Sequence, residues 1–306
     1  MAARLKPVEP AHAADPHAVA PGRLFAVRLG TALGVLVPLA GVGLAGWLTW
    51  GRGFGWVELL MVAGMYTVTA MGVTVGFHRL YTHRSFEAVA PVRFLLGVCG
   101  SMAIQGPLIE WVSRHRRHHQ HSDDVGDPHS PHHHGDGLVG FAKGFVHAHI
   151  GWAFNPDPPG GEKYVPDLRK SRVARLVSAL FPVWAVLGVI LPAAVGGLLS
   201  GTWGGAAAGA VWGGLVRIFL VHHLTWSINS VCHLWGSRPY PTRDKSRNNA
   251  LFGILAFGEG WHNNHHAFPV SARHGLRWWQ LDASYLAIRA LEACGLAWAV
   301  KRPAAA

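Results

Sequence analysis

Histidines carry the chemistry that this sequence suggests. The chain has 21 of them, and the pattern H-x-x-H-H occurs twice. Positions i, i+3 and i+4 share one face of an α-helix, so each triplet is expected to aim three imidazoles at one point. A third cluster adds two more histidines. The eight side chains are His78, His83, His115, His118, His119, His262, His265 and His266.

These clusters predict a metal centre assembled from distant parts of the chain. The alternative is general histidine richness at the surface, which is how we interpret His132, His133 and His134 in a Gly/Pro-rich loop. Asn229 and His233, at i and i+4, add a ninth imidazole and an amide that could bind metal through water. Nine imidazoles exceed the roughly four to six ligands of one ion and suit two, and neutral nitrogen ligands fit iron, copper or zinc.

Two other kinds of metal protein are less consistent with the pattern. A structural zinc site would need four ligands, usually including cysteine, but the three cysteines are scattered. A metal transporter would carry polar groups within its apolar segments; His222 and His223 come nearest, and we interpret them as packing residues or neighbours of the ligands. Carboxylates are scarce near the boxes, apart from Glu110, Asp123 and Glu259, unlike the glutamate-rich di-iron sites of soluble bundles.

The composition indicates a membrane protein. Half of the residues are hydrophobic and 14% are charged, against about 25% in soluble domains. The formal charge of +11 lies outside the apolar segments, which favours lipid headgroups and an acidic protein over nucleic acid as partners. A G-x-G-x-x-G match at residues 41–46 lies inside an apolar stretch with no preceding strand, so we interpret it as small residues for helix packing.

Four segments are long and apolar enough to cross a bilayer. The expected spans are about residues 29–51, 57–77, 176–199 and 203–228. Turns are expected around residues 50–55 and 200–204. Basic residues are concentrated outside these turns, so the positive-inside rule predicts cytoplasmic termini and a cytoplasmic cap that carries all the boxes.

Two local features bear on how the boxes meet. Residues 94–109 are uncharged but short and are interrupted by Gln105-Gly106-Pro107, so we expect them at the interface, with the first two boxes on one side of the membrane. His78 and His83 are five positions apart, and we expect the helix to end or bend between them.

The motifs resemble those of the membrane fatty acid desaturases, in particular the bacterial branch of the stearoyl Δ9 type, over about residues 25–280. The matching motifs are His78-Arg-Leu-Tyr-Thr-His83, Glu110-Trp111 with His115-Arg-Arg-His118-His119, Asn229-Ser230 with His233-Leu-Trp-Gly236, and Gly258-Glu-Gly-Trp-His262-Asn-Asn-His265-His266. The resemblance implies an all-α integral membrane fold with four transmembrane helices and a cytosolic helical cap. It also implies a di-iron centre that uses O₂ and two electrons to introduce a cis double bond, usually between C9 and C10 of a saturated acyl chain.

Carried over to this chain, the resemblance implies a specific set of site residues. The implied iron ligands are His78, His83, His115, His118, His119, His233, His262, His265 and His266, with Asn229 through water. An acyl chain offers no polar handle, so its reacting carbons must be held at a fixed depth. The candidates to line such a tunnel are Gln105, Trp111, Trp226 and Trp261. Gly106 stands where acyl-CoA-using members commonly have asparagine, which leaves CoA, acyl-carrier protein or lipid open as the carrier.

The resemblance also sets the expected domains, partners and alternatives. We expect a disordered cytoplasmic tail at 1–23, the desaturase domain at 24–280, and a C-terminal cytosolic helix with a tail at 281–306, in a bacterial inner-membrane type of protein. Electrons are expected from a separate ferredoxin, rubredoxin or cytochrome b5-like protein. Its docking is expected at basic residues around the second and third boxes: Arg114, Arg116, Arg117, Arg243, Lys245 and Arg247. The alternatives are a related di-iron hydroxylase or ketolase and, more distantly, a non-enzymatic metal-binding membrane protein.

Overall fold

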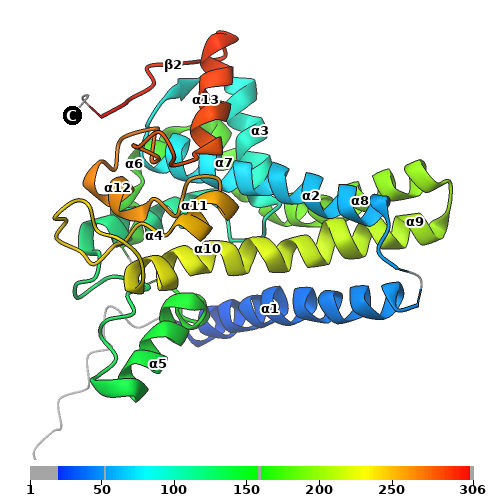
Figure 1. Cartoon of the computed structure of the whole chain (residues 1–306), viewed down its shortest axis with the longest axis horizontal. Helices are drawn as coiled ribbons and strands as arrows, with labels where there is room; N and C mark the ends of the chain where they lie inside the picture. The colour runs from blue at the N-terminus through cyan, green and yellow to red at the C-terminus, as the bar shows by residue number, and fades with distance from the viewer. Residues whose placement is uncertain (1–19, 52, 158–159, 304–306) are drawn as a thin grey trace, which may run out of the picture.

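Four long apolar helical rods form the body of the protein (Figure 1). The structure is a computed structural model that describes residues 20–51, 53–157 and 160–303. Each rod is long and apolar enough to cross a membrane, which confirms the predicted all-α membrane architecture. The rods are α1 (Pro21–Thr49), α2 (Trp56–Met71) with η1 (Gly72–Thr82), α8 (Phe181–Ser200), and α9 (Trp203–Ala208) with η4 (Gly209–Val216) and α10 (Arg217–Leu234).

Two helix boundaries differ from those expected. α1 begins at Pro21, before the uncharged stretch, because proline is well suited to the first turn of a helix; residues 1–19 of the expected tail lie outside the described residues. The third rod begins at Phe181 rather than near 176, because α7 (Arg172–Ala179) ends there and a proline occupies the first turn of α8. The fourth rod continues past residue 228 to Leu234, so that Asn229 and His233 lie on one helix, as expected.

The helix ends between His78 and His83, as expected, but it is wound as a π-helix up to that point. η1 is a π-helix in which His83 N–H donates to the carbonyl of His78 at 3.1 Å, and it ends at Thr82. A π-helix closes its hydrogen bonds from i to i+5, so residues five apart fall on the same side. The two imidazole ring centroids are consequently 4.7 Å apart.

A short helix returns the chain so that the first two boxes meet. α3 (Ala90–Ser101) packs against η1 and is shorter than a membrane span, as predicted for this segment. The packing is close at Gly72, where an added Cβ would lie 2.1 Å from the backbone nitrogen of Gly100. The chain then turns through residues 102–107 into α4 (Leu108–His121), which carries the second box.

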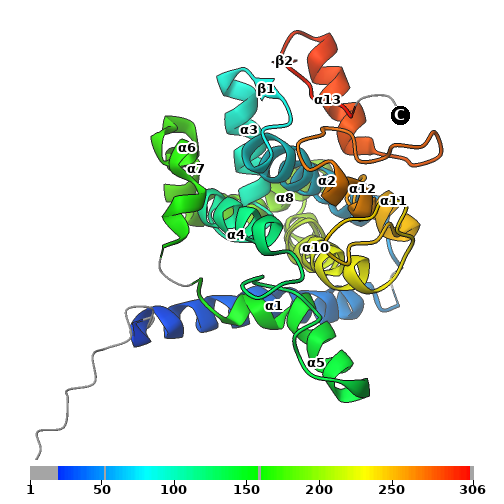
Figure 2. The same cartoon turned by 90° about the vertical axis from the view of Figure 1, so that its left-hand side faces the viewer.

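The remaining elements form a cap at one end of the rods (Figures 1 and 2). They are α5 (Gly137–His149), η2 (Gly151–Phe154), η3 (Gly161–Tyr164), α6 (Pro166–Lys170), α7, α11 (Ala250–Leu255), α12 (His262–Ala267) and α13 (Ala283–Ala293). The C-terminal helix expected within 281–306 is α13, which ends at Ala293, and β2 (Ala297–Trp298) then pairs antiparallel with β1 (Glu87–Ala88). Gly295, at φ 69°, lies between α13 and this strand and allows the reversal.

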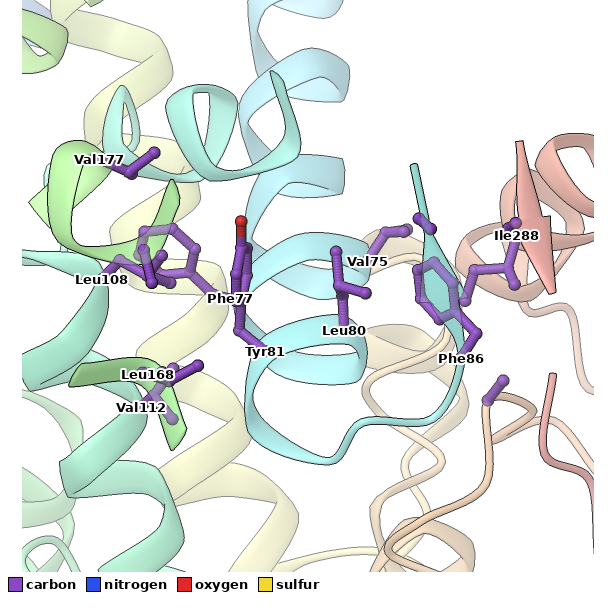
Figure 3. Close-up of a cluster of buried hydrophobic side chains, with 14 of the residues drawn as sticks. Val75, Phe77, Leu80, Tyr81, Phe86, Leu108, Val112, Leu168, Val177 and Ile288 are labelled. Atoms are coloured by element: carbon purple, nitrogen blue, oxygen red, sulfur yellow. The ribbon is translucent and has the colours of Figure 1, made fainter. Parts of the chain in front are cut away.

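A hydrophobic core fixes η1 between the cap helices (Figure 3). Phe77 and Leu108 are fully buried and join η1 to α4, while Phe86 and Ile288 join the segment after η1 to α13. Complete burial of such a side chain contributes about 1.5–3 kcal/mol. The π-helix therefore presents its histidines from a well-packed support.

Candidate metal centre

The histidine boxes converge into two adjacent groups in the cap. Within each group, one ligand nitrogen from every histidine lies within 4.8 Å of the others. The first group, termed the five-histidine group, is His78, His83, His115, His119 and His265. The second, termed the four-histidine group, is His118, His233, His262 and His266. Together they contain all nine histidines that the sequence singled out as candidate ligands.

Each H-x-x-H-H triplet serves both groups, so the expectation that a triplet aims at one point was wrong. From α4, His115 and His119 face the five-histidine group, whereas His118 faces the other. In α12 the arrangement is reversed, and the middle histidine, His265, joins the five-histidine group. At 3.6 residues per turn, positions i and i+4 are about 40° apart, while i+3 lies about 60° to the other side of i. One triplet can therefore bridge two centres.

Imidazole Nε2 atoms lie close to one another in the five-histidine group. The Nε2 of His265 lies 3.1 Å from Nε2 of His78 and 3.0 Å from Nε2 of His119, which is itself 3.1 Å from Nε2 of His115. His83 Nε2 is buried without a hydrogen-bond partner among the described residues. A metal about 2.1 Å from each nitrogen holds neighbouring nitrogens about 3 Å apart. The residues present therefore fit a metal ion.

The four-histidine group has the same spacing. His262 Nε2 lies 3.0 Å from Nε2 of His233 and 3.1 Å from Nε2 of His266. His118 Nε2 is buried and makes no hydrogen bond within the part of the chain that the structure describes. Asn229 and His262 line the same cavity, and binding of metal by Asn229 through water stays a prediction.

Carboxylates orient four of these imidazoles from behind, through Nδ1. The pairs are His78 with Glu259 at 2.6 Å, His118 with Asp127 at 3.0 Å, His233 with Asp123 at 2.7 Å and His266 with Asp244 at 2.7 Å. An Nδ1–H that donates to a carboxylate leaves the lone pair on Nε2, so the network assigns the tautomer that can bind metal.

Sequence reasoning found only part of this outer shell. It named Asp123 and Glu259 as nearby carboxylates but missed Asp127 and Asp244. Asp244 lies 22 positions from the histidine that it contacts, and no periodicity connects the two. Asp127 could have been found as a carboxylate in the polar loop just after the second box. Glu110, also named, lines a cavity that His78 and His115 line as well.

Burial favours the neutral form, which is the form that binds metal, in several of these imidazoles. It lowers the pKa of several of them well below 6.5, namely His83, His115, His119, His262 and His265. Burial also lowers the pKa of His266 to about 4, although the hydrogen bond to Asp244 opposes this shift. Burial raises the pKa of Glu259 to about 7, against the opposing charge of Arg79, which lies 2.9 Å away.

A largely apolar cavity of about 340 Å³ leads to the histidines. Gln105, Trp111 and Trp226 line it, as expected. The Trp111 indole donates to Gln105 Oε1 at 3.2 Å, and Gln105 Nε2 donates to the Thr225 hydroxyl at 2.7 Å. Trp261 is not part of the lining: it is buried elsewhere, and its indole donates to the carbonyl of Leu281 at 2.8 Å.

The cavity extends from the metal-ligand candidates to the first membrane helix. Its walls include His78, His115 and His262 as well as Gly30 and Gly34 of α1. Gly30 is exposed on the surface of α1. The cavity therefore extends between the histidine groups and α1.

The basic residues divide into paired and exposed sets. Arg114 is paired with Asp157 at 2.7 Å, and Arg116 with Asp167 at 2.7 Å. Arg117 donates to the carbonyl of Gly126, and Arg247 to that of Gly236. Arg243 and Lys245 are exposed. Arg243 also lines a polar pocket with His119 and His266.

The histidines attributed to surface histidine richness or to packing lie outside both groups. His133 is largely exposed and contacts the carbonyl of Asp123, whereas His132 contacts the carbonyl of His233. His223 pairs with His149 at 3.0 Å. His222 contacts the carbonyls of Ala103 and Ile104, in a loop that lines the cavity.

Comparison with known proteins agrees with this site. A sequence model described as fatty acid desaturase matches residues 54–299. The chain belongs to the fatty acid desaturase family. It is 42% identical over 272 residues to a hex-5-enoyl-[acyl-carrier protein] acetylenase of Moorena producens, with 88% of this chain and 85% of that protein covered.

Two further relatives in this family show how widely its substrates vary. The chain is 39% identical over 252 residues to an sn-1 stearoyl-lipid 9-desaturase of Anabaena variabilis, covering 81% of this chain and 85% of that one. It is 40% identical over 255 residues to an acyl-CoA C20 Δ5-desaturase of Anemone leveillei, covering 82% and 76%. Family membership makes this chain an oxidoreductase of fatty acyl groups, while its carrier and regiospecificity require separate argument.

Proposed function

We propose that this protein is an O₂-dependent desaturase that introduces a cis double bond, at Δ9, into a saturated long-chain acyl group. The observation that carries the proposal is the pair of histidine groups, with their Nε2 lone pairs turned inward, at the end of an apolar cavity. Two iron ions are the proposed cofactors. One would be held by the five-histidine group, and the other by the four-histidine group with Asn229 acting through water.

The reaction balances as –CH₂–CH₂– + O₂ + 2 e⁻ + 2 H⁺ → –CH=CH– + 2 H₂O. When bound, the irons would supply the oxidation that removes both hydrogens from an unactivated chain. The protein's own residues hold the nine imidazoles in the cap, and carboxylates orient four of them through Nδ1. This preorganisation means that little rearrangement is needed when metal binds.

The cavity wall supports a fixed depth of the acyl chain within the cavity. Gln105, Trp111 and Thr225 satisfy one another's hydrogen bonds, so this polar cluster needs no partner from the substrate. Methylenes that contact the adjoining apolar wall are held at a set depth relative to His78 and His262, which also line the cavity. Because the acyl chain has no polar group near its reacting carbons, this depth selects the carbon–carbon bond that becomes the double bond.

The acyl carrier is proposed to be a membrane lipid or CoA. The relative from Anabaena variabilis acts on a stearoyl-lipid and that from Anemone leveillei on an acyl-CoA. The cavity's lining by α1, with Gly30 exposed on that helix, favours entry of a lipid-linked chain from the bilayer.

A separate electron donor, of ferredoxin, rubredoxin or cytochrome b5-like type, is proposed to dock at Arg243 and Lys245. Both side chains are exposed, and Arg243 lines a polar pocket that reaches His119 and His266. Both termini and the site are proposed to lie on the cytoplasmic side of a bacterial inner membrane, because the positive-inside rule favours that side for the basic cap.

The test is expression in a host that lacks its own desaturase, followed by gas chromatography of fatty acid methyl esters. A new monoenoic acid with its double bond between C9 and C10 is the expected product. An oxygenated product would instead identify a hydroxylase or ketolase. Bound metal with unchanged fatty acids would identify the protein as a non-enzymatic metal-binding membrane protein.

A further inference from the structure

Side chains of α10 hold the loop that forms one wall of the cavity. Arg217, which is fully buried, donates to the carbonyls of Met102 at 2.7 Å and Gly188 at 2.6 Å. One turn or so further along α10, His222 Nε2 lies 2.8 Å from the carbonyl of Ala103 and 3.1 Å from that of Ile104. Carbonyls accept, so Nε2 carries the proton and donates to both.

The loop needs such support because its backbone is strained. Ile104 has φ 58°, in the left-handed region, where a β-branched residue is a genuine outlier. Conformations of this kind persist only where their surroundings impose them. The two carbonyls that His222 contacts belong to the peptide groups on either side of the Ile104 Cα. A single N–H thus fixes the orientation of both.

The shape of this loop matters because its residues face the substrate cavity. Ile104, Gln105 and Gly106 all line the cavity, and so does His222. Gln105 connects the loop to α10 through the Thr225 hydroxyl at 2.7 Å. The loop also leads directly into α4, which carries histidines of both groups. Its conformation therefore sets the distance between the cavity wall and the histidine groups.

We propose that His222 is a specificity-determining positioning residue, which fixes the left-handed turn at Ile104 and thereby the position of the double bond. The inference rests on the proposed desaturase function. His222 acts through the two carbonyls rather than as a metal ligand. A displacement of about 1 Å at a reacting carbon costs on the order of 100-fold in rate, so a relaxed loop would both slow the reaction and change the carbons presented.

The decisive experiment compares three variants by the position of the double bond in the product. His222→Leu removes the donor while keeping comparable bulk, His222→Gln retains an N–H donor, and His223→Leu is the matched control one position away. We expect a mixture of positional isomers and an at least tenfold lower kcat from His222→Leu, with unchanged metal content. His222→Gln should restore the single isomer, and His223→Leu should behave as the wild type.

A suppressor arm tests the proposal even where His222→Leu is unstable. Glycine adopts positive φ without strain, so Ile104→Gly combined with His222→Leu should recover the melting temperature that His222→Leu loses. The proposal is overturned if folded His222→Leu makes the wild-type isomer alone, or if Ile104→Gly gives no recovery. A wild-type protein that makes no unsaturated product would refute the proposed function instead, and the melting-temperature comparison would still test whether His222 supports the turn.

Discussion

Replacing Asp123 by asparagine should weaken metal binding by the four-histidine group while preserving the fold. Asp123 Oδ2 accepts from His233 Nδ1 at 2.7 Å and from the backbone N–H of Lys245 at 2.8 Å, and Oδ1 accepts from the Ser130 hydroxyl at 2.9 Å. Asparagine can keep its carbonyl oxygen at the first position and donate its amide N–H to the Ser130 oxygen. The geometry is retained, and the negative charge is lost.

The expected magnitude follows from the burial of this contact. The side chains of Asp123 and His233 are 2% and 1% exposed, so solvent does not screen the interaction. Loss of an outer-shell partner of a metal-binding histidine lowers metal affinity about 10- to 100-fold, or about 1.4–2.8 kcal/mol. The effect should be confined to one of two metals, because His233 belongs to the four-histidine group alone.

The assay is metal retention by purified, iron-loaded protein dialysed against a series of chelator concentrations. Asp123→Asn should release one of its two metals at about 10- to 100-fold lower chelator concentration than the wild type. The matched control is Asp124→Asn, since this neighbouring carboxylate is exposed and bonds the N–H of Val125. Equal release from both variants, or equal loss of both metals from Asp123→Asn, would refute the reasoning.

Three further predictions address the ligands, the donor surface and the cap. His265→Ala should abolish desaturation in a folded protein and His133→Ala should not, as measured by product analysis; equal losses would mean that the ligand boundary is wrong. Lys245→Glu should raise the KM for the electron donor more than it lowers kcat. The donor-dependent rate should also fall with salt, because the Debye length shrinks from about 10 Å at 0.1 M to about 3 Å at 1 M. A rate that does not change with salt would mean that the donor docks elsewhere. Arg116→Ala should destabilise the cap by about 1.5–3 kcal/mol, measured by thermal unfolding. Burial alone would raise the pKa of Asp167, but hydrogen bonds from Arg116 hold it below its usual value, so this deficit should be present at neutral pH and shrink as the pH falls through that pKa.

Arg116 has a structural role that its position in the sequence did not reveal. From sequence, Arg116 belonged to the surface expected to steer the electron donor. In the structure its guanidinium donates to the carbonyls of Tyr81, Thr82 and Tyr164 as well as to Asp167. It therefore ties the end of η1 to the cap. Sequence proximity to a histidine box could not distinguish this role from docking, because the carbonyls that it contacts lie more than 30 positions away.

The sequence by itself determined the membrane spans and the candidate ligands, because both signals are local. A bilayer requires long apolar segments, and the turns near Trp50 and Gly201 were visible as breaks between them. Helical spacing likewise marked the two histidine triplets, and Asn229 with His233. Boundaries were less certain, since a helix such as α1 extends past its apolar stretch wherever the first turn tolerates proline.

Tertiary structure alone decided how these residues are combined. It wound η1 as a π-helix that brings His78 and His83 together, and it divided each triplet between two groups. It brought Asp127 and Asp244 behind their histidines, and the donor of His222 onto the strained Ile104 turn. Periodicity gives the face on which a side chain lies, but its partner depends on how distant segments pack. Residue types and their spacing therefore predicted the chemistry, whereas the geometry proposed to select one carbon–carbon bond arises only in the fold.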